Sequence, residues 1–172
     1  MHLPNRRCRL KNIGFTYIEL IIVIAIIGFL STFFLFTYPG VQKNSRDSKR
    51  LNDLKQYQTA LEVYANSHGG YYPRRTSIVL TSVELCTDLG LTDCPIDIRS
   101  GRFVCGSIGN IPQICNYYYQ SNGTCAYGSP CASQFVLFTR LEKESNYFVH
   151  CSGGVSGKVN LSTTFTNGNC PL

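Results

Sequence analysis

Residues 11–20 read Lys11-Asn-Ile-Gly-Phe-Thr-Tyr-Ile-Glu-Leu20 and lead into an apolar run that ends at Tyr38. Between Phe15 and Tyr38 there are 24 residues, and Glu19 is the only charged one. A helix of this length, at about 1.5 Å per residue, is about 36 Å long and can cross the hydrocarbon core of a bilayer. The run therefore predicts a single membrane-spanning helix.

A basic segment comes directly before the run, with Arg6, Arg7, Arg9 and Lys11. Basic residues on this side predict that the N-terminus stays in the cytoplasm and the rest of the chain lies across the membrane. A cleaved secretory signal needs a shorter apolar core and a small-residue cleavage site. Here the run is long and continues into Tyr38-Pro-Gly-Val41, so we expect the apolar helix to be retained.

Glu19 stands out because it places a carboxylate one turn into an otherwise apolar helix. Burying an ionised group in lipid is costly, so such a residue is a functional candidate. The alternative is that Glu19 lies close enough to the helix start to reach the lipid headgroups.

The stretch Gly14-Phe-Thr-Tyr-Ile-Glu-Leu20, with its basic leader and apolar helix, resembles the processing site of type IV pilins and pseudopilins. The resemblance implies that a prepilin peptidase cuts between Gly14 and Phe15 and that Phe15 is then N-methylated. It also implies that Phe15 and Glu19 are the assembly residues. The carboxylate of Glu19 would pair with the α-amino group of Phe15 on a neighbouring subunit, which stabilises two groups that are each costly alone.

Three further stretches extend the resemblance over residues 11 to about 73. They are Arg46-Asp-Ser-Lys-Arg-Leu-Asn-Asp-Leu54, Ala60-Leu-Glu-Val-Tyr64 and Gly70-Tyr-Tyr-Pro73. They are similar to the second half of the long helix in the major pseudopilins of type II secretion and in related bacterial pilins. The resemblance implies three partners: further copies of this chain in a helical filament, the prepilin peptidase and methyltransferase, and an inner-membrane assembly platform.

Pro39-Gly40 is the first interruption after the apolar run, and it predicts a kink or local break. Residues 41–67 then recur at helical spacing and predict an amphipathic helix that ends at His68-Gly-Gly70. The expected packing stripe is Asp47, Leu51, Leu54, Gln58, Leu61 and Ala65. The residues expected on the other faces are Arg46, Lys49, Arg50, Lys55 and Glu62.

The expected organisation has four parts. They are a leader at 1–14, a transmembrane and filament-core helix at 15–38, the amphipathic half of the same helix at 39–67, and a globular head at 68–172. The expected fold is α+β: the long N-terminal helix packs on a small antiparallel β-sheet, with disulfide-rich loops. The best strand candidates are 103–104, 114–120, 135–141 and 147–150, the last two joined by a polar turn.

Cysteine content indicates an oxidising compartment. Cys8 lies in the leader and eight cysteines remain beyond it, an even number that predicts four disulfides. Sequence alone leaves the connectivity open. We expect nearest-neighbour pairs because they close the shortest loops: Cys86–Cys94, Cys105–Cys115, Cys125–Cys131 and Cys151–Cys170. Zinc is disfavoured because there is no C-x-x-C spacing.

Other chemistry finds little support. The net charge of +6 lies mostly in the leader, since residues 15–172 carry 12 Lys and Arg against 10 Asp and Glu. A patch of Arg74, Arg75, Arg99 and Arg102 could contact DNA or another anion, although a solvated basic face is the commoner role. No G-x-S-x-G, H-E-x-x-H or phosphate-loop motif is present, so we expect no enzyme activity. We expect no metal or other cofactor.

Calcium is the open case, because major pseudopilins usually carry a calcium site in the C-terminal loop. Between Leu141 and Leu172 the only carboxylates are Glu142 and Glu144, too few for a cage of oxygen ligands. This departure favours a pilus subunit over a secretion pseudopilin.

The sequence thus predicts a structural subunit of a type IV pilus-like filament. It would be a single-pass protein of the inner membrane before assembly and part of a cell-surface filament afterwards. Two alternatives remain open: a pseudopilin of a type II secretion system, and a minor pilin that acts as an adhesin or binds DNA.

Overall fold

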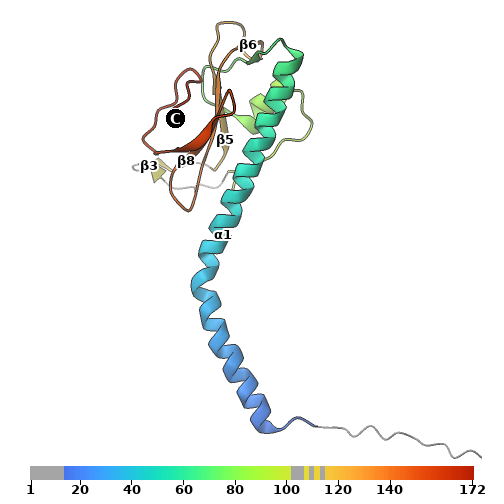
Figure 1. Cartoon of the computed structure of the whole chain (residues 1–172), viewed down its shortest axis with the longest axis vertical. Helices are drawn as coiled ribbons and strands as arrows, with labels where there is room; N and C mark the ends of the chain where they lie inside the picture. The colour runs from blue at the N-terminus through green and yellow to red at the C-terminus, as the bar shows by residue number, and fades with distance from the viewer. Residues whose placement is uncertain (1–13, 102–106, 109–110, 113–114) are drawn as a thin grey trace, which may run out of the picture. The chain divides into compact units, whose positions relative to one another are not determined.

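The computed structural model describes residues 14–101, 107–108, 111–112 and 115–172. It forms two compact units, Met1–Pro39 and Gly40–Leu172. Helix α1, Tyr17–Ser67, contributes residues to both units (Figure 1). We refer to them as the first and second unit and describe each by itself.

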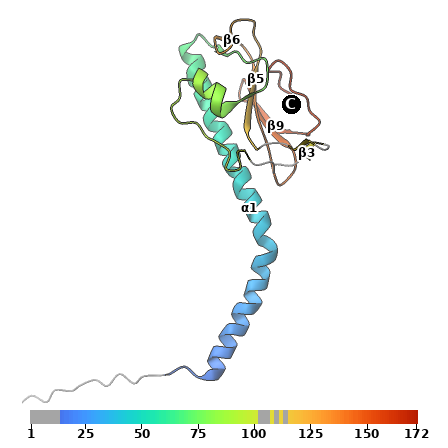
Figure 2. The same cartoon turned by 180° about the vertical axis from the view of Figure 1, so that it is seen from behind.

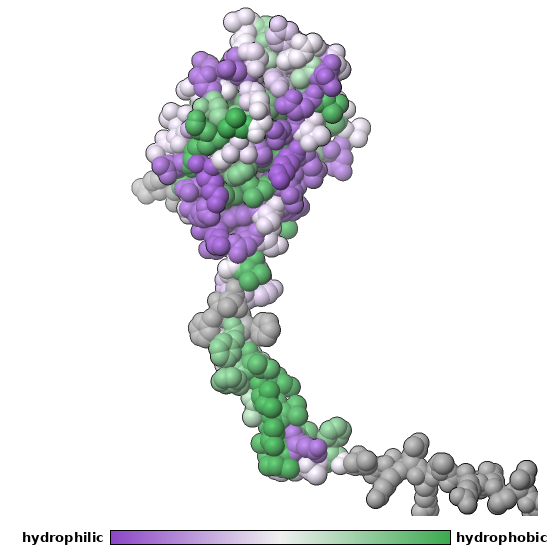
Figure 3. Space-filling model, viewed as in Figure 1, coloured by the Kyte–Doolittle hydropathy of each residue, from purple (hydrophilic) through white to green (hydrophobic). Residues whose placement is uncertain are grey.

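The first unit is a stretch of helix with exposed apolar side chains. Its large apolar residues are mostly more than half exposed, among them Ile18, Ile24 and Phe29, and apolar residues dominate its surface in Figure 3. Pro39 lies inside α1 and is the last residue of the unit. Among the described residues no single helix meets the length and hydropathy criteria for a membrane span. Tyr17–Phe33 and Tyr38–Ser67 meet them only as a bent pair.

The second unit is α+β. A π-helical turn, η1 (Thr81–Leu85), continues into a short helix, α2 (Cys86–Asp88); both views show them beside α1 (Figures 1 and 2). The strands are β1 (Tyr72–Pro73), β2 (Val79–Leu80), β3 (Ser107–Ile108), β4 (Ile111–Pro112), β5 (Tyr117–Ser121), β6 (Pro130–Ala132), β7 (Phe135–Arg140), β8 (Tyr147–Cys151) and β9 (Ser156–Val159).

The main sheet has five antiparallel strands in the order β2-β5-β7-β8-β9. Two smaller antiparallel pairs are β1 with β6 and β3 with β4. The β7–β8 hairpin fixes the register, with Phe138 opposite Val149 and Arg140 opposite Tyr147. The Leu141 amide donates to the Asn146 carbonyl at 2.8 Å across the polar turn that the sequence predicts.

One face of the sheet packs on α1. Alternate residues of a strand share one face of the sheet, and every third or fourth residue of a helix shares one side, so each element offers an apolar surface to the other. Leu54 and Leu61 are fully buried there, and a fully buried leucine contributes about 2 kcal/mol. The cluster on this face includes Leu54, Tyr57, Leu61 and Ala65 of the helix and Tyr117, Tyr119, Phe135 and Leu137 of the sheet. The opposite face carries Val136, Phe138, Tyr147, Val149, Cys151 and Phe165.

Helix α1 ends at Ser67, as the sequence predicts, through two glycines. Gly69 has a φ of +67° and Gly70 a φ of +88°. The Gly70 amide donates to the Ala65 carbonyl at 2.8 Å, the six-residue closure of a Schellman motif. This reversal brings the chain back towards β1.

The strand candidates at 135–141 and 147–150 correspond to β7 and β8, and the 114–120 candidate corresponds to β5 apart from its first residues. The candidate at 103–104 lies outside the described residues. Strands β1, β2, β3, β4, β6 and β9 have no counterpart among the strands that the sequence predicts.

Candidate functional sites

Glu19 is held by the start of its own helix. The Thr16 hydroxyl and the Thr16 amide donate to Glu19 Oε2 at 2.9 and 3.1 Å, and the Glu19 amide donates to Thr16 Oγ1 at 3.4 Å. This reciprocal pattern is a capping box, which satisfies amides that the first turn leaves free. The T-x-x-E spacing of Thr16 and Glu19 is the sequence signal for this cap.

Gly14 and Phe15, the predicted processing residues, lie in the segment just before α1. Phe15 is 90% exposed, and a side chain added at Gly14 would meet no atom within 4 Å. The peptide bond between Gly14 and Phe15 is therefore accessible to another molecule, such as a peptidase.

The predicted basic patch separates into two sets of contacts. Arg74 donates to the Gly123 carbonyl at 3.0 Å and to the Cys125 carbonyl, and its guanidinium lies 4.6 Å from the Tyr127 ring centroid. Arg75 forms ion pairs with Asp88 at 2.8 Å and with Glu84 at 2.9 Å.

Arg99 belongs to the other set, where it faces Glu142 at 3.3 Å. Arg102 lies outside the described residues. The described arginines are thus spread over two sets of contacts, and both Arg75 and Arg99 have carboxylate partners, which leaves less charge for an external anion.

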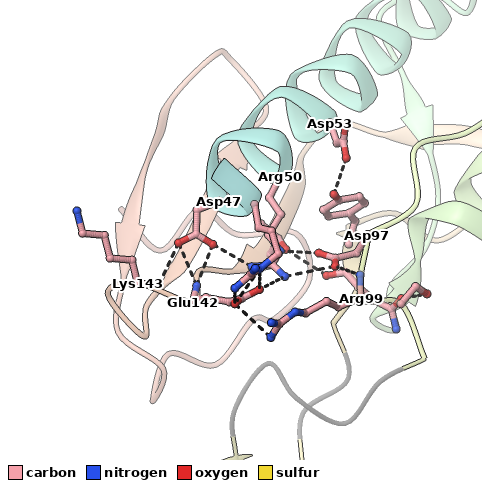
Figure 4. A network of polar contacts seen from close by, with 12 residues as sticks. Asp47, Arg50, Asp53, Asp97, Arg99, Glu142 and Lys143 are labelled. Carbon is pink, nitrogen blue, oxygen red and sulfur yellow. Dashed lines mark hydrogen bonds and ion pairs between the residues drawn. The ribbon is translucent and has the colours of Figure 1, made fainter. Parts of the chain in front are cut away.

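A charged network centred on Arg50 joins three parts of the second unit (Figure 4). Arg50 Nε donates to Asp97 at 2.5 Å, Nη1 to Asp47 at 2.9 Å and Nη2 to Glu142 at 2.7 Å. Its side chain is only 1% exposed. Arg50 was expected on a face of the helix away from the packing stripe, but it is buried together with most of that stripe.

Two further arginines complete this network. Arg46 forms a two-bond contact with Glu142, with Nη2 at 2.7 Å from Oε2 and Nε at 3.0 Å from Oε1. With Arg99 included, three arginines face three carboxylates, so the formal charges balance. Arg46, also expected away from the packing stripe, is likewise partly buried, with a side chain that is 17% exposed.

Asp47 fastens the turn after β7 to the helix. Its carboxylate accepts the Glu142 amide at 2.9 Å and the Lys143 amide at 3.0 Å. Because Asp47 and Arg50 lie one helical turn apart, α1 presents an acceptor and a donor to the same turn. The network connects α1, the 97–99 segment and the end of β7.

Electrostatics favour the charged forms in this network. Burial alone would raise the pKa of Glu142, but its bonds to Arg46 and Arg50 outweigh burial and lower the pKa. Burial would lower the pKa of Arg50, but Asp97 and Glu142 raise it overall. The Glu142 carboxylate, held in this way, is a poor base and a poor metal ligand.

Two buried tyrosines flank the network. Burial, together with a 2.6 Å hydrogen bond to Asp53 and the charge on that carboxylate, raises the pKa of Tyr117. Burial raises the pKa of Tyr57 to about 12, and its hydroxyl donates to the Pro95 carbonyl at 2.7 Å. Both phenols therefore remain protonated at neutral pH and act as structural donors.

Three disulfides are present among the described residues: Cys86–Cys94, Cys125–Cys131 and Cys151–Cys170. These are three of the four nearest-neighbour pairs expected from spacing. Cys115 is also disulfide-bonded, and its expected partner, Cys105, lies outside the described residues.

For a calcium site, the two carboxylates of the C-terminal region already have cationic partners. Glu142 contacts Arg46 and Arg50, and Glu144 pairs with Lys158 at 2.7 Å. Within the described parts of the chain, no group of three or more His, Cys, Asp or Glu side chains could hold a metal ion.

Comparison with family models, characterised proteins and solved structures found no match to this chain.

Proposed function

We propose that this chain is the structural subunit of a type IV pilus-like filament, processed between Gly14 and Phe15. The observation that carries the proposal is the Gly14–Leu20 stretch, in which a glycine, an apolar residue and an in-helix glutamate follow a basic leader. In this role the protein acts by assembly and not by catalytic turnover.

The exposed apolar surface of the first unit supports this role. Ile18, Ile24 and Phe29 are each more than half exposed, and an apolar surface of this kind indicates contact with lipid or with other apolar chains. Before assembly the apolar helix would lie in the inner membrane. In the filament it would pack against the same helix of other copies.

The second unit supports an extracellular position for the head. Disulfides persist in oxidising compartments, and those described lie between Cys86 and Cys170, beyond the predicted membrane helix. A basic leader held in the cytoplasm is consistent with a head exported across the membrane.

The capping box makes the role of Glu19 testable in a sharp way. Glutamine at this position keeps the cap, because a capping box accepts either Glu or Gln, but it removes the charge. If Glu19 pairs with a neighbouring α-amino group, Glu19→Gln and Glu19→Ala both abolish filaments while leaving the cut after Gly14 intact.

Filaments are counted by electron microscopy and cleavage is read by intact mass. Glu144→Ala is the matched control, because it removes a carboxylate of the second unit that pairs with Lys158. Normal filaments from Glu19→Gln would leave only the cap as the role of Glu19 and would refute the charge-pairing mechanism. Gly14→Leu is expected to block cleavage, because its side chain would occupy the open space beside the Gly14–Phe15 peptide bond that the peptidase has to reach.

A secretion pseudopilin is the second candidate, favoured by the similarity of residues 46–73 to the major pseudopilins. A pseudopilus is a short periplasmic structure. Overexpression that produces long surface fibres would favour the pilus role, and secretion defects without surface fibres would favour the pseudopilin.

A further inference from the structure

Three exposed lysines gather around the first turns of α1 in the second unit. Lys43 lies one helical turn before Asp47 on the same face of α1, and Lys49 lies two residues after Asp47. The Lys143 amide donates to Asp47 Oδ2 at 3.0 Å, and Figure 4 shows the Lys143 side chain pointing away from the charged network. All three lysine side chains are therefore open to a molecule outside the chain.

The charge of these lysines is not balanced by the carboxylates around them. Asp47, Asp97 and Glu142 contact arginines, and Glu144 pairs with Lys158. Every Asp and Glu of the chain is among the described residues, and none of them forms an ion pair with the three lysines. This end of the second unit thus presents unpaired positive charge, which suits an anionic surface.

Lys43 and Lys49 follow closely on the apolar run that ends at Tyr38. The helix is continuous from Tyr38 to Ser67, so Lys43 lies about 8 Å and Lys49 about 17 Å beyond Tyr38 along its axis, at about 1.5 Å per residue. The headgroup layer of a bilayer is about 5–8 Å deep on each side. With the apolar run in lipid, Lys43 reaches the headgroups, and Lys49 lies within about one Debye length, ~10 Å, of their outer edge.

We propose that Lys43, Lys49 and Lys143 bind the headgroups of anionic phospholipids on the head side of the membrane before assembly. This inference rests on the membrane stage of the proposed function. Lysine suits such a surface because its ammonium is a compact point charge on a flexible stem and accepts headgroups in many orientations. The contact keeps the second unit at the membrane surface, and it is released when the subunit leaves the lipid.

The test places the full chain in nanodiscs of phosphatidylcholine alone, or of phosphatidylcholine mixed with phosphatidylglycerol. A water-soluble reagent acetylates the lysine amines, and mass spectrometry gives the rate at each position. The anionic lipid is expected to slow acetylation about fivefold at Lys43 and Lys143 and less at Lys49. Lys55 is the matched control, because it is exposed on the same helix but lies about 26 Å beyond Tyr38, and its rate should not change.

Three outcomes would overturn the proposal. Equal rates in the two kinds of nanodisc, or the same slowing at Lys55 as at Lys43, would contradict the lipid contact alone. Protection that appears only in assembled filaments would assign the lysines to a second copy of the chain instead. A chain that enters neither kind of nanodisc would contradict the membrane stage of the proposed function, and this inference with it.

Variants then assign the contact to these side chains. The triple variant Lys43→Gln, Lys49→Gln, Lys143→Gln is expected to lower, by about twofold or more, the ratio of phosphatidylglycerol to phosphatidylcholine that co-purifies with the protein from mixed bilayers. Lys55→Gln should keep the wild-type ratio, and a triple variant that also keeps it would contradict the assignment. All four positions are exposed, so the variants are expected to fold, which thermal unfolding checks. Should the triple variant fail to fold, the acetylation rates of the wild-type chain still decide the proposal.

Discussion

Arg50 makes contacts with carboxylates from three segments of the chain, and its burial is tolerable only because of them. A guanidinium removed from water loses hydration that hydrogen bonds and opposite charge must offset. Asp47, Asp97 and Glu142 provide both at 2.5–2.9 Å. The cluster is therefore sensitive to the loss of any one member.

Arg50→Ala is predicted to destabilise the protein by about 3–5 kcal/mol, because it leaves three carboxylates without their shared partner. Urea unfolding of the oxidised protein measures the change. Lys158→Ala is the control, since Lys158 and Glu144 form a pair of half-exposed side chains, and exposed pairs contribute little. An Arg50→Ala protein as stable as Lys158→Ala would contradict the importance of the network.

His150 is the second residue whose environment sets an expectation. It is 3% exposed, and neither ring nitrogen has a hydrogen-bond partner among the described residues. The centroid of the Phe148 ring lies 5.1 Å from that of the imidazole. Burial, and then the charge of Lys55, lower its pKa from the ordinary value of 6.5. The folded protein therefore favours the neutral imidazole.

His150 makes the stability of the folded protein depend on pH. Below pH 6.5 His150 of the unfolded chain binds a proton more readily than His150 of the folded protein. The contribution of neutral His150 to the free energy of unfolding is therefore fully present above pH 6.5. It is lost as the pH falls through the lowered pKa of the folded state.

His150→Leu should remove this part of the pH profile, the loss of stability as the pH falls below 6.5, measured by urea unfolding at each pH. If His150→Leu keeps the pH profile of the wild-type protein, this part of the pH dependence does not come from His150. The carboxylate contribution of Glu142 appears separately, below its ordinary value of 4.5.

These residue-scale features show where sequence reasoning reaches its limit. The spacing of Asp47 and Arg50 is visible in the sequence, but the other partners of Arg50 lie 47 and 92 positions away. A charged side chain on a helix is usually solvated. Only the tertiary fold brings Asp97 and Glu142 to this arginine.

At the scale of elements, α1 and the β7–β8 hairpin were predictable because they combine long periodic patterns with clear stop signals. Glycines end the helix, and a polar turn joins two apolar strands. Strand β9 escaped prediction because Ser156–Val159 contains glycine and lysine and is largely solvent-facing. Strands β1 and β6 are too short to form a pattern.

Gly40, inside α1, and Gly69, just after its end, make a matched pair for substitution by alanine. Gly69→Ala is predicted to destabilise by about 1 kcal/mol, because alanine is strained at a φ of +67°. Gly40→Ala is predicted to be neutral or stabilising by up to about 1 kcal/mol, because Gly40 lies within α1 with open space around it. Thermal unfolding of both variants checks the difference. A destabilised Gly40→Ala would indicate that the helix needs backbone freedom after Pro39.

At the scale of the whole molecule, the two units differ in what surrounds their apolar residues. The second unit buries its apolar side chains on both faces of a sheet, and disulfides close its loops. The first unit exposes its apolar side chains along the helix. The amino-acid pattern predicted both tendencies, because a run of apolar residues with one charge cannot cover itself, whereas alternating strands can.

The most direct test of the proposed function is the intact mass and N-terminal sequence of the protein from cells, before and after reduction. The account predicts a chain that begins at N-methylated Phe15 and gains eight hydrogens on reduction, one for each of the eight cysteines beyond the leader. A chain that retains the Gly14–Phe15 bond in assembled material would contradict the prepilin route, and with it the filament role.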